Sequence, residues 1–305
     1  LRVRRRPAVA AGSDMEVWPI GRLVSWVDGY LAERGVEAPR LSAELLVSHV
    51  LGCRRIDLYT RWAEPVDEQR RAVLRDLVRR AGAHEPIAYL VGCTEFYSLT
   101  IHVDRRCLIP RPETELLVER AIEALRGRNG EQQVLDLCTG SGCIAVAIAR
   151  NFERCRVVAT DVSDGALAVA AENVRRQGLE HRVRLLCGDL FEPIIAGLDA
   201  ARFDVITCNP PYVRQGDLAE LEPNVRDYEP ALALDGGADG LEVYRRIAAK
   251  VGDFLRPGGV FMGEIGADQG ATVRDLLETA DCFAAIHVEP DAAGHDRVVI
   301  AEARP

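Results

Sequence analysis

The tetrapeptide Asn209-Pro210-Pro211-Tyr212 directly follows an apolar segment, residues 203–208, that has the composition of a β-strand. An Asn-Pro pair often begins a turn, and a turn is the simplest interpretation. At the carboxyl end of a strand the same residues can also hold a planar nitrogen. The Asn209 side-chain oxygen and the Pro210 carbonyl would each accept one N–H, while Tyr212 stacks on the flat group. The motif therefore predicts a site for an amide or an exocyclic amine.

A nitrogen of this kind is a poor nucleophile because its lone pair is conjugated. A site that alkylates it must orient the nitrogen, accept its protons and exclude water. No general base is needed before transfer, because the N–H becomes acidic only as the new bond to carbon forms. We therefore predict methyl transfer, with Asn209, Pro210 and Tyr212 as catalytic residues and Asn209 to Tyr212, Pro211 included, as the substrate site.

A second candidate site is the loop Cys138-Thr139-Gly140-Ser141-Gly142, between a strand-like segment and a helical pattern. Glycines at such a junction let a ligand approach the backbone. The spacing Gly140-x-Gly142-x-x-Ala145 also matches a dinucleotide fingerprint. The loop alone therefore fits a nicotinamide dehydrogenase, a methyltransferase that uses S-adenosylmethionine, or a packing turn without a ligand.

Three aspartates help to choose between these cofactors. Asp161 ends the second strand, where its carboxylate can accept hydrogen bonds from the ribose of either cofactor. Asp136 would repel a pyrophosphate but suits the positively charged methionine end of S-adenosylmethionine. Asp189, after the third strand, is either a solvated aspartate or an acceptor for the adenine amino group, with Leu190 or Phe191 against the ring. These residues favour S-adenosylmethionine.

The elements that position both sites alternate between strand and helix from Val134 onward. The strand-like segments cover residues 134–138, 157–162, 183–187, 203–208, 260–265, 285–288 and 298–301. Such alternation predicts an α/β domain with a mostly parallel seven-stranded sheet and helices on both faces. Ligands bind such sheets beyond the carboxyl ends of the strands, where both candidate sites fall.

The amino-terminal third has a different pattern. Apolar residues recur at spacings of three and four from Ile20 to about Ala83, so we expect residues 15–88 to form a small all-helical domain. Residues 89–108 are predicted to form a hairpin or linker, and residues 109–305 are predicted to form the catalytic domain. Residues 1–14, which precede Met15, are expected to be a disordered tail or an upstream misread.

Composition limits the class of protein. The net charge of −9 provides little attraction to a phosphate backbone, so no direct nucleic-acid binding is expected. No apolar run approaches the roughly 18 to 20 residues that a membrane helix needs. The nine cysteines include no Cys-x-x-Cys pair and the six histidines are scattered, which argues against a disulfide framework and a metal site. A reducing cytoplasm is the expected compartment.

Six segments together resemble the release-factor glutamine methyltransferases, the PrmC/HemK family. They are Ile109–Glu115, Leu135–Ala145, Asn209–Tyr212, Glu229–Leu232, Glu264–Gly266 and Gly294–Val299. The resemblance covers essentially the whole chain from about Met15, including the helical amino-terminal region. It implies a Rossmann-like class I methyltransferase fold and S-adenosylmethionine as cofactor. It also implies that the substrate is the glutamine of the Gly-Gly-Gln motif in class-one peptide chain release factors, recognised by the helical domain.

Carried over by position, the family's donor site falls on the loop, on the aspartates and on the first residue of the tetrapeptide. The cofactor-binding residues are then Asp136, Cys138, Thr139, Gly140, Ser141, Gly142, Asp161, Asp189, Leu190 and Asn209. Cys138 stands where the family most often has glycine. A cysteine rarely adopts the backbone torsions that glycine tolerates, so the sequence alone does not predict the torsion at this position. Some relatives have a larger aromatic residue in place of Leu190. Arg111 and Glu113 either line the donor pocket or only begin a helix at Pro112.

Other substrates fit parts of the same pattern. A related glutamine methyltransferase acts on a large-subunit ribosomal protein and shares the cysteine-containing loop. Nucleic-acid adenine or guanine amino methyltransferases use the same Asn-Pro-Pro-Tyr geometry on a flipped base. A non-enzymatic adaptor with an inactive fold is least compatible, because both half-sites are intact.

Overall fold

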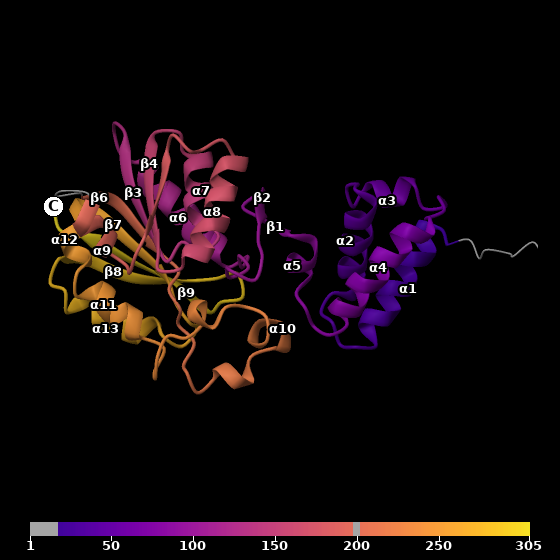
Figure 1. Ribbon diagram of the computed structural model, residues 1–305. Helices are drawn as coiled ribbons and strands as arrows, with labels where there is room; N and C mark the ends of the chain where they lie inside the picture. Colours follow the sequence, from indigo (N-terminus) through magenta and orange to yellow (C-terminus); the bar gives the residue numbers. More distant parts are fainter. Residues whose placement is uncertain (1–17, 198–201) are drawn as a thin grey trace, which may run out of the picture. The chain divides into compact units, whose positions relative to one another are not determined.

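The computed structural model describes residues 18–197 and 202–305. The chain divides into two compact units, Leu1–Val91 and Gly92–Pro305. Figure 1 shows helices throughout the first unit and a helix-covered sheet in the second. The expected tail, residues 1–14, lies outside the described residues.

The first unit is built from helices. They are α1 (Ile20–Ala32), α2 (Pro39–Leu51), α3 (Asp57–Thr60), α4 (Glu68–Ala81) and α5 (Ile87–Val91). The periodic apolar residues of α1, α2 and α4 form one buried cluster, which includes Val24, Leu46 and Val78. The Asp67 carboxylate caps the start of α4 by accepting from the Arg70 backbone N–H.

A hairpin opens the second unit. Strand β1 (Cys93–Phe96) pairs antiparallel with β2 (Leu99–His102), and Tyr97 and Ser98 between them both have positive φ angles, 49° and 61°. Two consecutive left-handed residues are typical of a tight two-residue hairpin turn. Residues 89–91, expected in this segment, instead belong to α5, because the buried Leu90 packs in the core of the helical unit.

The second unit contains a seven-stranded sheet in the order β5-β4-β3-β6-β7-β9-β8, in which β9 runs antiparallel to both neighbours. The strands are β3 (Gln132–Leu137), β4 (Cys155–Asp161), β5 (Val183–Cys187), β6 (Phe203–Cys208), β7 (Leu255–Glu264), β8 (Phe283–Pro290) and β9 (Asp296–Ala303). The predicted mostly parallel sheet is confirmed. Strands β7, β8 and β9 extend further than the apolar segments that predicted them.

Helices cover both faces of this sheet (Figure 1). They are α6 (Thr114–Arg126), α7 (Cys143–Asn151), α8 (Asp164–Arg176), α9 (Glu192–Gly197), α10 (Pro223–Arg226), α11 (Glu242–Ala248), α12 (Val251–Phe254) and α13 (Gly270–Glu278), with short 3-10 turns at Leu218–Glu220 and Ala231–Ala233. Strand side chains alternate between the faces. Leu135 and Leu137 of β3 therefore pack in one core with Ile247 of α11 and Val273 of α13.

The order of the strands determines where a ligand can bind. The chain runs from β3 outward through β4 to β5, then returns to β6 on the other side of β3. Connections leaving β3 and β6 therefore diverge, which opens a crevice at their carboxyl ends. The loop after β3 and the tetrapeptide after β6 both begin at this crevice.

Candidate active site

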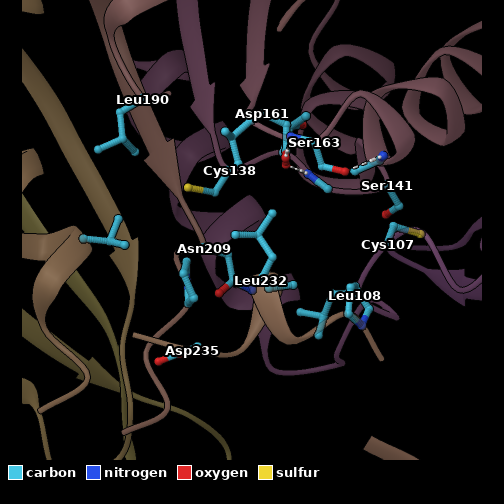
Figure 2. Close-up of a pocket in the computed structure, with 18 of the residues that line it drawn as sticks. Cys107, Leu108, Cys138, Ser141, Asp161, Ser163, Leu190, Asn209, Leu232 and Asp235 are labelled. Atoms are coloured by element: carbon cyan, nitrogen blue, oxygen red, sulfur yellow. Dashed lines mark hydrogen bonds between the residues drawn. The ribbon is translucent and has the colours of Figure 1, made fainter. Parts of the chain in front are cut away.

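A cavity of about 630 Å³ lies at the carboxyl ends of β3, β4, β5 and β6. Its volume is within the usual range for sites that bind small molecules. Figure 2 shows Cys138, Asp161 and Asn209 around it, each from a different strand end. The predicted residues on its wall are Cys138, Thr139, Gly140, Ser141, Asp161, Asp189, Leu190, Asn209 and Pro211.

The loop after β3 has an unusual backbone. Cys138, Gly140 and Gly142 have φ angles of 55°, 56° and 77°. Glycine adopts this region without penalty, whereas a non-glycine residue there carries a strain of about 1 to 3 kcal/mol. Cys138 therefore keeps the torsion that glycine would have. Gly142 is not on the cavity wall, and a Cβ on it would lie 3.0 Å from the Cβ of Ala170. This glycine allows α7 and α8 to approach each other.

Asp161 anchors the loop and faces the cavity (Figure 2). Its Oδ2 accepts the Gly140 N–H at 2.8 Å, and its Oδ1 accepts the Ser163 N–H at 2.9 Å. Burial raises the pKa of the carboxyl, while these backbone donors lower it. Each oxygen retains a lone pair for a ligand hydroxyl.

Asp136 does not reach the cavity wall. Its fully buried carboxylate accepts hydrogen bonds from the hydroxyls of Thr139, at 2.5 Å, and Thr207, at 2.8 Å. Thr207 projects from the neighbouring strand β6, so pairing of β3 with β6 brings the two side chains together. Burial raises the Asp136 pKa to about 7. Asp136 therefore supports the loop through Thr139, and its predicted electrostatic role toward the methionine end of the donor stays a prediction.

Of the residues predicted to contact the adenine, Asp189 and Leu190 line the cavity and Phe191 does not. Asp189 is not a lone solvated aspartate, because it forms an ion pair with Arg246, which also lines the cavity. Leu190 has a positive φ of 49° and presents its side chain at the wall. Phe191, the alternative partner for the ring, is instead buried against Phe254 with ring centroids 4.5 Å apart.

The tetrapeptide after β6 is held by side chains from other elements. Asn209 Nδ2 donates to Thr114 Oγ1 at 3.3 Å, and Thr114 Oγ1 donates to Glu264 Oε2 at 2.5 Å. The Tyr212 hydroxyl donates to Glu264 Oε1 at 3.2 Å. Asn209 and Pro211 line the cavity, whereas Pro210 and Tyr212 are not among its lining residues. The Tyr212 hydroxyl contacts Glu264, and the stacking of its ring on the substrate stays a prediction.

Glu264 was not predicted to have a role. It ends β7 and is 1% exposed. Burial raises its pKa, and the hydrogen bond from Thr114 lowers it. The Tyr244 hydroxyl donates to its backbone carbonyl at 2.5 Å, which fixes the residue further. The segment Glu264–Gly266 contributed to the family resemblance, but its sequence contains no chemical signal that links it to Asn209.

Arg111 and Glu113 were expected either to line the donor pocket or only to begin a helix. Neither lines the cavity. Arg111 forms an ion pair with the buried Glu229 at 2.6 Å, and the other Glu229 oxygen accepts the Ile109 N–H at 3.1 Å. Glu113 stands at the start of α6. These residues brace the segment before α6 against the segment that follows Glu229.

Other walls of the cavity come from segments that the strand pattern did not single out. They include Arg106, Leu108, Pro110, Ser163, Pro230 and Leu232. Leu232 is 61% exposed, which is unusual for a leucine. Within residues 18–197 and 202–305 no cluster of three or more potential metal ligands is present. No helix of this part of the chain is long and apolar enough to span a membrane.

Comparison with known families matches two models in order along the chain. Residues 22–92 match the PrmC N-terminal domain, and residues 112–223 match the methyltransferase small domain. The catalytic domain of hMettl16 has a similar fold, with a TM-score of 0.55 and 18% identity over 72% of this chain and 81% of that one. These matches confirm the predicted methyltransferase fold with a helical amino-terminal domain.

Curated relatives match almost the full length. A release factor glutamine methyltransferase of Geobacter sulfurreducens is 44% identical over 93% of this chain and 96% of its own, and one of Rhodopirellula baltica is 41% identical over 95% and 98%. A solved release-factor-specific protein-(glutamine-N5) methyltransferase from Alicyclobacillus acidocaldarius is 29% identical, covers 67% of this chain and 100% of its own, and has a TM-score of 0.40. The dehydrogenase alternative is therefore excluded. On this identity across nearly its whole length, the chain belongs to the release factor glutamine methyltransferase family.

Proposed function

We propose that this chain transfers a methyl group from S-adenosylmethionine to the side-chain amide nitrogen of a glutamine in peptide chain release factors. The target is the glutamine of the Gly-Gly-Gln motif in the class-one factors. The observation that carries the proposal is the Asn209 amide, held on the wall of the cavity with its nitrogen bound to Thr114. Its oxygen remains available to accept an N–H from the substrate amide.

The donor half of the cavity fits S-adenosylmethionine in shape and charge. Asp161 offers free lone pairs beside the glycine-type torsions of Cys138 and Gly140. The two arginines on the described wall, Arg106 and Arg246, are paired with Asp104 and Asp189. When bound, the donor supplies an electrophilic methyl group on a sulfonium. Asp161 would accept from the ribose, and the loop residues Cys138 to Ser141 would contact the remainder of the donor.

A test of this donor site is the substitution Asp161→Ala. A charged hydrogen bond contributes about 1.5 to 3 kcal/mol, so donor affinity should fall by one to two orders of magnitude. Calorimetric titration measures the affinity, and Asp275→Ala, an exposed aspartate of α13, is the matched control. Because Asp161 also holds Gly140, thermal unfolding must show that the variant is folded; unchanged affinity in a folded variant removes Asp161 from the site.

The acceptor half uses an amide oxygen. The Asn209 oxygen accepts one N–H of the glutamine amide, which aims the nitrogen lone pair at the donor. The Pro210 carbonyl, the second acceptor expected from the sequence, does not line the cavity in this structure. The apolar residues Leu108 and Leu232 line the cavity and would exclude water once a bound substrate covers them. The N–H proton leaves after the new N–C bond forms, so the site needs no strong base.

The helical unit and the overall charge support a protein substrate. Residues 22–92 match the PrmC N-terminal domain, and we assign recognition of the release factor to it. The net charge of −9 disfavours direct binding to nucleic acid. All nine cysteines are free, which fits the cytoplasmic location that this substrate implies.

The deciding experiment offers labelled S-adenosylmethionine with three substrates in parallel: a purified release factor, large-subunit ribosomal proteins and nucleic acid. Label should appear in the release factor alone. It should disappear when the glutamine of the Gly-Gly-Gln motif is replaced by alanine. Labelling of a ribosomal protein or of nucleic acid, with an unlabelled release factor, would overturn the proposed substrate.

A further inference from the structure

Three side chains from distant parts of the chain form a continuous hydrogen-bonded row at the acceptor half of the cavity. Asn209 follows β6, Thr114 begins α6 and Glu264 ends β7. The row runs from Asn209 Nδ2 to Thr114 Oγ1, and from there to Glu264 Oε2. Thr114 and Glu264 are each 1% exposed, so water does not compete for these contacts.

The polarity of this row follows from the chemistry of its members. The Thr114 hydroxyl has a single proton, and this proton points toward the Glu264 carboxyl group, to which the hydroxyl donates. The Thr114 oxygen then presents only lone pairs to Asn209. The amide nitrogen is the only end of Asn209 that can donate to them, so the amide oxygen must face away from Thr114.

The orientation matters because the two ends of an asparagine amide have the same shape and opposite hydrogen-bonding character. Asn209 with its oxygen toward the cavity accepts an N–H from a substrate amide. Asn209 rotated by 180° presents an NH₂ group that opposes the substrate N–H. The shape of the side chain does not distinguish the two rotamers. A neighbouring group that can only accept a hydrogen bond from the amide selects the rotamer whose NH₂ group faces it.

Further contacts fix the position of the Glu264 side chain. The Tyr212 hydroxyl donates to its other carboxylate oxygen at 3.2 Å, so both oxygens accept from hydroxyl groups. Burial raises the Glu264 pKa, whereas Thr114 and the positive charge of Arg297 lower it. Tyr212 thus ties the last residue of the tetrapeptide to the same carboxylate that orients the first.

We propose that Glu264 is a positioning residue that acts through the Thr114 hydroxyl to fix the Asn209 amide with its oxygen toward the cavity. This inference rests on the proposed glutamine methyl transfer, and it adds two buried residues: Thr114, which lies on the cavity wall, and Glu264, which does not line the cavity. Their effect is on the orientation of the acceptor. It should therefore appear in kcat and leave the affinity for the donor unchanged.

Kinetics of four full-length variants test this role. Thr114→Val keeps the shape but removes the hydroxyl, and Glu264→Gln lets residue 264 donate as well as accept, so each should lower kcat at least tenfold and leave the donor Kd within about twofold. Thr114→Ser restores the hydroxyl and should restore kcat to within about threefold. Glu302→Gln, on the exposed side of β9, is the matched control and should match the wild type. Wild-type kcat in folded Thr114→Val, or no rescue by serine, overturns the inference.

A second measurement does not depend on the substrate. The side-chain NH₂ signal of Asn209 can be assigned in the NMR spectrum by its loss in Asn209→Ala. Its exchange with solvent should be at least tenfold faster in Thr114→Val than in the wild type, and near the wild-type rate in Thr114→Ser. Equal exchange rates of the Asn209 NH₂ group in all three proteins would contradict the hydrogen bond from Asn209 to Thr114. If the wild type fails to methylate a release factor but the exchange pattern holds, the proposed substrate is wrong and the orientation of Asn209 stands.

Discussion

At the scale of single residues, Asn209 connects the two halves of the cavity. It follows directly on β6, beside the loop after β3, and its side chain is partly exposed to the cavity while its nitrogen is held by Thr114. A neutral amide is suited to this place because it accepts an N–H without adding a charge next to a sulfonium donor.

We expect Asn209→Ala to lower kcat by about a hundredfold or more, because one oriented acceptor is lost from the reacting nitrogen. Asn209→Asp keeps an acceptor of the same shape but adds a negative charge, which stabilises the charged donor more than the charge-dispersed transition state. It should therefore bind the donor at least as tightly as the wild type and turn over slowly. Steady-state kinetics on a release factor and calorimetry of donor binding separate these effects.

Asn129→Ala, which changes an exposed asparagine remote from the tetrapeptide in sequence, is the control for both measurements. Wild-type turnover by Asn209→Ala would show that another group orients the amide.

The buried Asp136 predicts a dependence of stability on pH. The unfolded chain loses this proton near the ordinary aspartate pKa of about 4, whereas the folded protein keeps it until about pH 7. The stability that the protonated group contributes is therefore present below pH 4 and is lost as the pH rises through 7. Each pH unit in this window corresponds to about 1.4 kcal/mol.

Asp136→Asn removes this titration. The free energy of unfolding of the wild type, relative to that of Asp136→Asn, should fall between about pH 4 and pH 7 and stay constant above it. Urea unfolding of both proteins at a series of pH values measures the difference, and other titrating groups cancel in it. A constant difference across the window would mean that Asp136 is ionised at its ordinary pKa.

At the scale of elements, the junction of β3 and α7 requires close packing against α8. Gly142 has a φ of 77°, and an added Cβ would meet the Ala170 Cβ at 3.0 Å. Gly142→Ala should therefore destabilise the fold by about 1 to 3 kcal/mol from backbone strain, with a further cost from the contact, and weaken donor binding by displacing the loop.

Gly178→Ala provides a matched comparison. Gly178 has a similar φ of 68°, but an added Cβ there meets nothing within 4 Å. Urea unfolding should show a smaller loss of stability, and calorimetry should show unchanged donor affinity. Equal losses in the two variants would mean that the contact with α8 does not matter.

The sequence predicted elements better than it predicted contacts between them. Apolar runs identified all seven strands, and the ends of β3, β4 and β6 correctly marked the cavity. Local patterns contain no information about which strands become neighbours. The pairing of Asp136 with Thr207 depends on β6 lying beside β3, and the anchor of Asn209 lies 95 residues earlier, at Thr114. Neither contact has a sequence signal of its own.

The hairpin boundary shows another limit. Aromatic and β-branched residues from Tyr89 onward favoured an extended segment, but residues 89–91 lie in α5. Leu90 packs into the core of the helical unit, and burial there outweighs the local preference.

At the scale of the whole molecule, the two units have separate hydrophobic cores. Among the described residues, those that line the cavity lie between Arg106 and Arg246, within the second unit. We therefore expect the second unit to bind the donor by itself. If the helical unit recognises the protein substrate, its removal should weaken binding of the release factor and leave binding of the methyl donor unchanged.

Deletion of residues 1–91 should leave the donor Kd unchanged within about threefold and raise KM for a release factor at least tenfold. Calorimetry with the donor verifies that the shortened protein is folded, and methyl-transfer kinetics give KM. A normal KM in a shortened protein that binds the donor would contradict the role assigned to the helical unit.

The insertion of β9 between β7 and β8 has a consequence for folding. Strand β8 pairs only with β9, and β7 has an unpaired edge until β9 arrives. Glu264 lies opposite Val298 of β9, whereas the loop around Asp161 depends on β3, β4 and β5. An intermediate without β9 would thus have a nearly complete donor pocket, a poorly fixed acceptor site and an open strand edge, which is a common origin of aggregation. We expect donor binding to appear before catalytic activity during refolding, and self-association to be greatest in between.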